Sequence, residues 1–169
     1  MRKDASEAQP ERRHLRRRRV LLSGVVSDAN GQSAIDCTIR DMSVRGAQVQ
    51  LPRALQLDKE IYLVDTRNEI AYLAKVSWTK ADRAGLSFVR SYELASDLPT
   101  QLRFLERLLF DAKLRQVRAL MRRGLPVEEA TRTVGLSEKY LERFDELRGI
   151  DKGVSRLLHQ AMRLLGKSG

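Results

Sequence analysis

Arginines are concentrated near the start of the chain at spacings that suit a compact anion. Six of the eight residues from Arg12 to Arg19 are arginine, and they include two overlapping pairs, Arg12 with Arg16 and Arg13 with Arg17. A guanidinium group forms paired hydrogen bonds with a phosphate or with the O6 and N7 atoms of guanine, and it stacks on bases. The block therefore favours a nucleotide or another anionic partner, with a solvated basic tail as the alternative.

A second polar group, Asp41–Gly46, lies between two segments of alternating polarity. The carboxylate of Asp41 can accept hydrogen bonds from paired N–H donors, and the hydroxyl of Ser43 can donate and accept. Gly46 can adopt a positive φ and lets a ligand approach the backbone closely. Taken alone, the same residues are also typical of an ordinary turn between two strands.

In this order and strand context, the two groups resemble the motifs of the PilZ family of bacterial cyclic-di-GMP receptors. That family carries an RxxxR motif on an N-terminal loop and a [D/N]xSxxG motif on a β-barrel. The second motif is complete as Asp41-x-Ser43-x-x-Gly46, and the first is present in two registers, of which we favour Arg13/Arg17 over Arg12/Arg16. The resemblance covers roughly residues 11 to 90, where Ala74–Trp78 and Gly85–Phe88 are similar to the last two strands of the family.

The resemblance implies a ligand site made of these motifs. Cyclic-di-GMP carries two phosphates and two guanines, which the arginines would bind by paired hydrogen bonds and by stacking. Asp41 would accept from the N–H edge of a guanine, Ser43 would bind at the same face, and Gly46 would leave room. The implied site residues are Arg12, Arg13, Arg16, Arg17, Asp41, Ser43 and Gly46. We expect the arginine arm to be mobile without ligand and ordered with it.

Period-two alternation and turn residues predict six short strands between residues 20 and 89. They are Val20–Val26, Ser33–Arg40, Gly46–Leu51, Ile61–Val64, Ile70–Trp78 and Leu86–Val89. The predicted fold class is α+β: a small six-stranded antiparallel β-barrel, PilZ-like, followed by a C-terminal α-helical module. The barrel domain spans residues 12–92 with its arginine arm, after a flexible tail at residues 1–11. Cys37 is expected to be buried, and Tyr72 and Trp78 are assigned to core packing rather than to stacking on a base.

After Tyr92 the apolar residues recur at helical spacing, which predicts a helical module over residues 97–166. Asp97 is expected to cap the first helix, Gly124 to end it and Pro126 to begin the next. Residues 126–144 weakly resemble a helix-turn-helix, but its recognition helix, Ser137–Leu147, would carry a net charge of −2. An acidic helix is disfavoured against DNA phosphates, so we favour a helical bundle that serves as a protein-interaction or dimerisation unit.

The last stretch, Val154–Leu165, has one apolar face. We favour its packing on the bundle over a basic amphipathic helix at a membrane surface.

Composition narrows the function classes further. The 169 residues include 32 Lys and Arg against 22 Asp and Glu, a net charge of +10 that implies an anionic partner. A single cysteine excludes a disulfide framework within the chain. Neither a signal-peptide apolar region nor an 18-residue apolar run is present, so we expect a cytoplasmic protein without a transmembrane segment.

The sequence shows no catalytic constellation. His14 and His159 lie far apart, and there is no metal-ligand spacing, Gly-rich phosphate loop or nucleophile elbow. We therefore predict no enzyme activity, no catalytic residues, no metal and no cofactor other than the ligand cyclic-di-GMP.

The favoured function is a bacterial cyclic-di-GMP-binding receptor that transmits second-messenger binding to a protein partner through its N-terminal arm and helical module. One alternative is a nucleic-acid-binding transcriptional regulator that uses the basic arm and a helix-turn-helix. The other is a PilZ-like scaffold without nucleotide binding.

Overall fold

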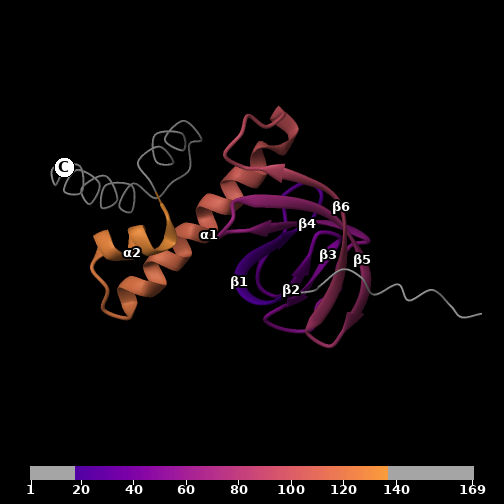
Figure 1. The fold of residues 1–169 in the computed structure, drawn as a ribbon, viewed down its shortest axis with the longest axis horizontal. Helices are drawn as coiled ribbons and strands as arrows, with labels where there is room; N and C mark the ends of the chain where they lie inside the picture. Colours follow the sequence, from indigo (N-terminus) through magenta and orange to yellow (C-terminus); the bar gives the residue numbers. More distant parts are fainter. Residues whose placement is uncertain (1–17, 137–169) are drawn as a thin grey trace, which may run out of the picture.

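The computed structural model describes residues 18–136, and residues 1–17 and 137–169 lie outside the description. The described chain forms a closed barrel of six antiparallel strands followed by two α-helices (Figure 1), which confirms the predicted fold class. Around the barrel the strands are hydrogen-bonded in the order β1-β2-β3-β6-β5-β4. Their bounds are β1 Arg18–Ser27, β2 Ala34–Ser43, β3 Gly46–Gln50, β4 Glu60–Asp65, β5 Ile70–Lys80 and β6 Arg83–Glu93.

Apolar side chains at alternate strand positions fill the barrel, as the period-two pattern predicted. Cys37 is one of them and is buried as expected, and this burial raises the pKa of its thiol to about 12. The interior cluster comprises Val26, Cys37, Ile39, Ala47, Val49, Leu51, Ile61, Leu63, Ala74, Ala84 and Leu86. The other face of these strands points away from this cluster.

Shifts of strand register interrupt the alternation next to the motif residues. A β-bulge places extra residues on one strand, so side chains beyond it change face relative to a strict alternation. Three shifts matter here: between Arg19 and Leu22 in the β1–β2 pair, between Ile39 and Asp41 in the β2–β3 pair, and between Val76 and Trp78 in the β5–β6 pair.

The prediction that Asp41 belongs to the turn between strands is wrong. Strand β2 continues through Asp41 to Ser43, and only Val44 and Arg45 form the turn before β3. The strand continues because Asp41, Met42 and Ser43 still pair with residues of β3. Asp41 is therefore held on two sides by neighbouring strands, which fixes the position of its side chain better than a turn would.

Two buried or half-buried aspartates cap turns of the barrel, one after β1 and one at the end of β4. The carboxylate of Asp28 accepts backbone N–H bonds from Asn30, Gln32 and Ser33 in the β1–β2 turn. Asp65, which is fully buried, accepts from the backbone N–H groups of the two residues after Thr66 in the β4–β5 turn. These bonds satisfy turn amides that no strand partner can reach.

The helical part begins later than Asp97, so the prediction that Asp97 caps the first helix is wrong. A 3-10 turn, η1 Thr100–Leu102, follows Pro99, and α1 spans Arg103–Arg122. Helix α2 spans Val127–Val134, with Pro126 before it and Gly135 in the left-handed conformation after it. The predicted stop at Gly124 and start at Pro126 are confirmed. The would-be recognition helix, Ser137–Leu147, and the stretch Val154–Leu165 lie outside the described residues.

Helix α1 lies along one side of the barrel and carries α2 at its far end (Figure 1). Its apolar face shares a buried cluster with the barrel, made of Val25, Tyr62, Val64, Ala71, Leu94, Leu105, Leu108, Leu109 and Ala112. Near the start of α1, the ring of Phe104 occupies the space that a Cβ on Gly31 would need, so the β1–β2 turn fits closely against the helix. The first helix of the predicted helical module thus packs on the barrel through a second buried cluster, separate from the barrel interior.

Candidate ligand-binding site

One cross-strand row of residues runs over the outside of the barrel across five strands. Arg19 on β1 pairs with Asp41 on β2, Asp41 with Gln48 on β3, Gln48 with Gly85 on β6, and Gly85 with Trp78 on β5. Directly paired residues in antiparallel strands point to the same face. Because Gln48 and Gly85 alternate with interior residues, the whole row faces outward. The row brings a cation, a carboxylate, an amide and an indole together on one surface.

Asp41 is half-buried, and its Oδ1 atom is buried without a hydrogen-bond partner within residues 18–136. Arg19 stands opposite it in register, but the described structure contains no ion pair between the two. A buried carboxylate oxygen without a donor costs free energy that a bound donor would recover. Among the described residues, Oδ1 of Asp41 is therefore an acceptor atom that no donor uses.

Ser43 and Gly46 have structural roles that the sequence did not show. The backbone N–H of Arg45 donates to Ser43 Oγ at 3.3 Å, and Ser43 Oγ donates to the carbonyl of Gly46 at 3.4 Å, which closes the turn. A Cβ on Gly46 would lie 2.1 Å from the carbonyl oxygen of Leu86, while Gly46 does not adopt a positive φ. The glycine is needed because β6 approaches closely, and not for a positive φ.

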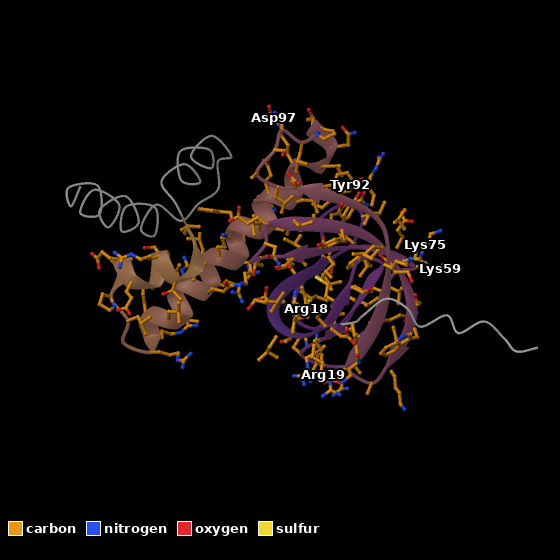
Figure 2. All side chains as sticks on the ribbon, in the orientation of Figure 1. Arg18, Arg19, Lys59, Lys75, Tyr92 and Asp97 are labelled. Atoms are coloured by element: carbon orange, nitrogen blue, oxygen red, sulfur yellow. The ribbon has the colours of Figure 1, made fainter. Side chains whose placement is uncertain are left out.

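The arginine arm joins the barrel beside Asp41. Arg18 and Arg19 are exposed at the start of β1 and pair with Met42 and Asp41 (Figure 2). The four predicted site residues Arg12, Arg13, Arg16 and Arg17 lie outside the described residues. Because Arg13 is five residues from Arg18, the chain length alone keeps it within about 18 Å of the start of β1.

Trp78 was assigned to the core, and this prediction is wrong. Its side chain is 41% exposed and lies across Gly85, where a Cβ would come within 2.1 Å of the indole Nε1. Tyr72, in contrast, is half-buried and stacks on Phe88, with ring centroids 4.1 Å apart, so its assignment to packing is confirmed. A glycine on the neighbouring strand opposite a tryptophan was the sequence signal that could have revealed an outward indole.

Comparison with known proteins identifies the family. The PilZ domain model matches residues 10–111, which include the arginine arm, the whole barrel and the first part of α1. The chain belongs to the PilZ domain family. Its members are regulatory binding domains, typically receptors for cyclic-di-GMP, rather than enzymes. Helix α2 and everything after it lie beyond the match.

Two solved structures are similar to this PilZ domain. One is the PilZ domain of CeSA from a cellulose-synthesizing bacterium, at 20% identity and a TM-score of 0.38, covering 57% of this chain and 96% of that one. The other is the Bacillus subtilis inhibitor of motility MotI/DgrA, at 17% identity and a TM-score of 0.38, covering 64% of this chain and 52% of that one. A search of curated proteins gives no match.

Other kinds of site find no counterpart in the part of the chain that the structure describes. Between residues 18 and 136 no three His, Cys, Asp or Glu side chains come together as metal ligands would. Over the same residues no helix is long and apolar enough to cross a membrane.

Proposed function

We propose that this PilZ domain is a receptor for cyclic-di-GMP that binds the ligand on the outer row of the barrel. The observation that carries the proposal is Asp41: a carboxylate with one buried oxygen that no described residue binds, placed between the start of the arginine arm and an outward indole. Guanine presents adjacent N–H donors on the edge opposite O6 and N7, and a carboxylate can accept both. The membership of the PilZ family supports the same ligand.

The remaining residues have complementary roles in this proposal. Arg13 and Arg17, or Arg12 and Arg16 in the other register, bind the phosphates and the O6 and N7 edge of guanine. Trp78 offers an aromatic face on which a base can stack. Ser43 and Gly46 hold the β2–β3 turn in shape rather than supplying the main ligand contacts.

Strand β1 supplies a physical route from the ligand to the helices. Its first residues, Arg18 and Arg19, continue from the arginine arm, and Val25 near its other end belongs to the cluster shared with α1. A ligand that fixes the arm therefore acts on a strand that contacts the helix at its far end. We propose that the domain passes the binding event to a protein partner by this route.

Calorimetric titration of the full chain with cyclic-di-GMP tests the receptor function, with GTP and cyclic-di-AMP as controls. Trp78 is the only tryptophan in the chain, so its fluorescence gives a second and local readout. We expect binding of cyclic-di-GMP alone, with a change in Trp78 emission. Arg13→Ala or Arg17→Ala should weaken the affinity for cyclic-di-GMP roughly five- to 150-fold, because a bidentate arginine–guanine contact contributes about 1–3 kcal/mol. Absence of both heat and a fluorescence change at high ligand concentration would exclude the receptor function.

A further inference from the structure

A groove lies between the barrel and the two helices, beside β1. Its volume is about 610 Å³, and it is lined by β1, the β4–β5 turn, α1, and the last residues of α2 together with Gly135. None of the outer-row residues lines it. The groove is therefore a separate feature of this chain, formed only because α1 and α2 follow the barrel.

The walls of the groove include apolar side chains open to solvent. Leu21 on β1 is 73% exposed, which is unusual for a leucine on a strand, and it lies within the register shift that follows Arg19. Leu22, Leu120 and Val134 line the groove beside it and are only half-buried. Exposed apolar side chains gathered in a concave surface favour a partner that brings apolar side chains of its own.

The rim of the groove is basic. Arg67 from the β4–β5 turn, Arg123 after α1 and Arg132 from α2 all line it, and none makes an ion pair with an acidic residue of the described chain. Glu69 is the only acidic residue among the lining residues, and it is bound to Lys113 at 2.5 Å. Within residues 18–136 the groove thus presents three guanidinium groups around apolar walls, and its one carboxylate is paired with Lys113.

We infer that this groove is a docking site for an acidic amphipathic helix of a protein partner. Such a helix matches both properties, since its apolar face would cover Leu21 and its neighbours while its carboxylates would pair with the arginines. A nucleic acid would use the arginines but would leave the leucines exposed. A basic helix, including the chain's own Val154–Leu165 with its arginines, would be repelled by the same rim.

The test uses the full chain and three fluorescein-labelled peptides of equal length. The first peptide has leucines at i, i+3, i+4 and i+7 with glutamates on the opposite face. The second is a scrambled sequence of the same composition, and the third has lysines in place of the glutamates. Fluorescence anisotropy measures their binding, with a duplex oligonucleotide as a competitor.

We expect the first peptide to bind at least about tenfold more tightly than either of the others. Binding of the first peptide should weaken about two- to fivefold in each of the variants Arg67→Gln, Arg123→Gln and Arg132→Gln, as for exposed charge pairs. The variant Leu21→Ser should weaken this binding further. Arg53→Gln, an exposed arginine outside the groove, is the matched control and should bind as the wild type does.

A thiol in the groove gives an independent readout. Because Cys37 is buried and its pKa is raised, a Leu21→Cys variant carries one reactive thiol. The first peptide should protect that thiol from alkylation but should leave the thiol of Val89→Cys, at an exposed position outside the groove, unprotected.

Three results would overturn the inference. Equal binding of the scrambled peptide would show that charge attraction alone holds the peptide, without docking. If the rim variants leave peptide binding unchanged, the peptide binds outside the groove. If no peptide binds with a dissociation constant below about 1 mM but the oligonucleotide binds, then the rim is a nucleic-acid surface. The inference does not rest on cyclic-di-GMP binding, because a rim variant that loses the peptide should keep its Trp78 response to the nucleotide.

Discussion

At the scale of single residues, the motif Asp41-x-Ser43-x-x-Gly46 separates into one residue with an unused acceptor atom and two residues that shape the backbone. Ser43 is engaged in the turn and Gly46 lies against the carbonyl of Leu86, whereas Oδ1 of Asp41 has no donor among the described residues. A substitution should therefore affect ligand binding in one case and folding in the other. The two effects can be measured separately.

Asp41→Asn should weaken cyclic-di-GMP binding by about ten- to 150-fold, because hydrogen bonds to a charged group contribute about 1.5–3 kcal/mol. The unfolding free energy should stay the same or rise, since the buried oxygen has no described donor to lose. Calorimetry and denaturant unfolding measure the two quantities, and Asp58→Asn, at an exposed position, is the control. A variant that binds normally but unfolds more easily would make Asp41 a structural residue.

Gly46→Ala and Gly85→Ala form a second comparison at this scale. A Cβ on Gly46 meets backbone, which cannot move aside, so the variant should lose about 1–3 kcal/mol of stability. A Cβ on Gly85 meets the indole of Trp78, a side chain that can rotate away, so stability should fall less while Trp78 emission shifts. Chemical unfolding monitored by Trp78 fluorescence measures both the stability and the emission of each variant. Equal loss of stability would show that Trp78 is held as rigidly as the backbone.

At the scale of elements, polar contacts of unequal burial fix α1 to the barrel. The side chain of Lys113 is 2% exposed and donates to Glu69 in the β4–β5 turn and to the carbonyls of Val134 and Gly135 at the end of α2. Arg115 forms a two-bond pair with Asp36 on β2, but this pair is largely exposed. Lys113 therefore joins three elements at one buried point, whereas Arg115 joins two at the surface.

Lys113→Ala should cost about 3–5 kcal/mol of unfolding free energy, because it leaves a half-buried carboxylate and two carbonyls without their donor. Arg115→Ala is the matched control on the same helix and should cost less than about 1 kcal/mol. Urea unfolding of both variants checks the difference. Similar costs for the two would mean that the buried contact does not hold the helices to the barrel.

At the scale of the whole molecule, the sequence predicted the barrel because alternating apolar residues can fill only one side of a sheet. The sequence analysis placed Asp41 in a turn and Trp78 in the core, and strict alternation from Ile39 and Val76 would place both on the interior side. A register shift follows each of these two apolar residues and turns the next motif residue outward. Such shifts depend on how a strand pairs with the next one, so the apolar pattern of a single strand could not predict them.

For the helices, the sequence predicted the ends but not the packing. Helical spacing and the residues Gly124 and Pro126 predicted where α1 ends and α2 begins, because these are local effects. The shared core of α1 and the barrel, and the groove beside it, depend on how distant surfaces meet. Neither could be predicted from residues 97–136 alone.

Cyclic-di-GMP should protect Cys37 from alkylation, which is a prediction about the stability of the whole barrel. Cys37 is the only cysteine, lies in the interior cluster on β2, and has a thiol whose pKa burial raises to about 12. At pH 8 the folded chain should therefore react only when the barrel opens. A ligand bound at 100 times its dissociation constant stabilises the folded state by about 2.7 kcal/mol, so the alkylation rate should fall about 100-fold.

The rate can be followed by mass spectrometry of the intact chain, with denatured protein as the reference for the unprotected thiol. Cyclic-di-AMP should give no protection, and Asp41→Asn should lose most of it at the same ligand concentration. If calorimetry shows binding but Cys37 reacts at an unchanged rate, then the thiol becomes accessible through a local opening of β2 that leaves the ligand in place. Since Asp41 and Cys37 lie on the same strand, that result would place the ligand away from β2 and would contradict the site proposed here.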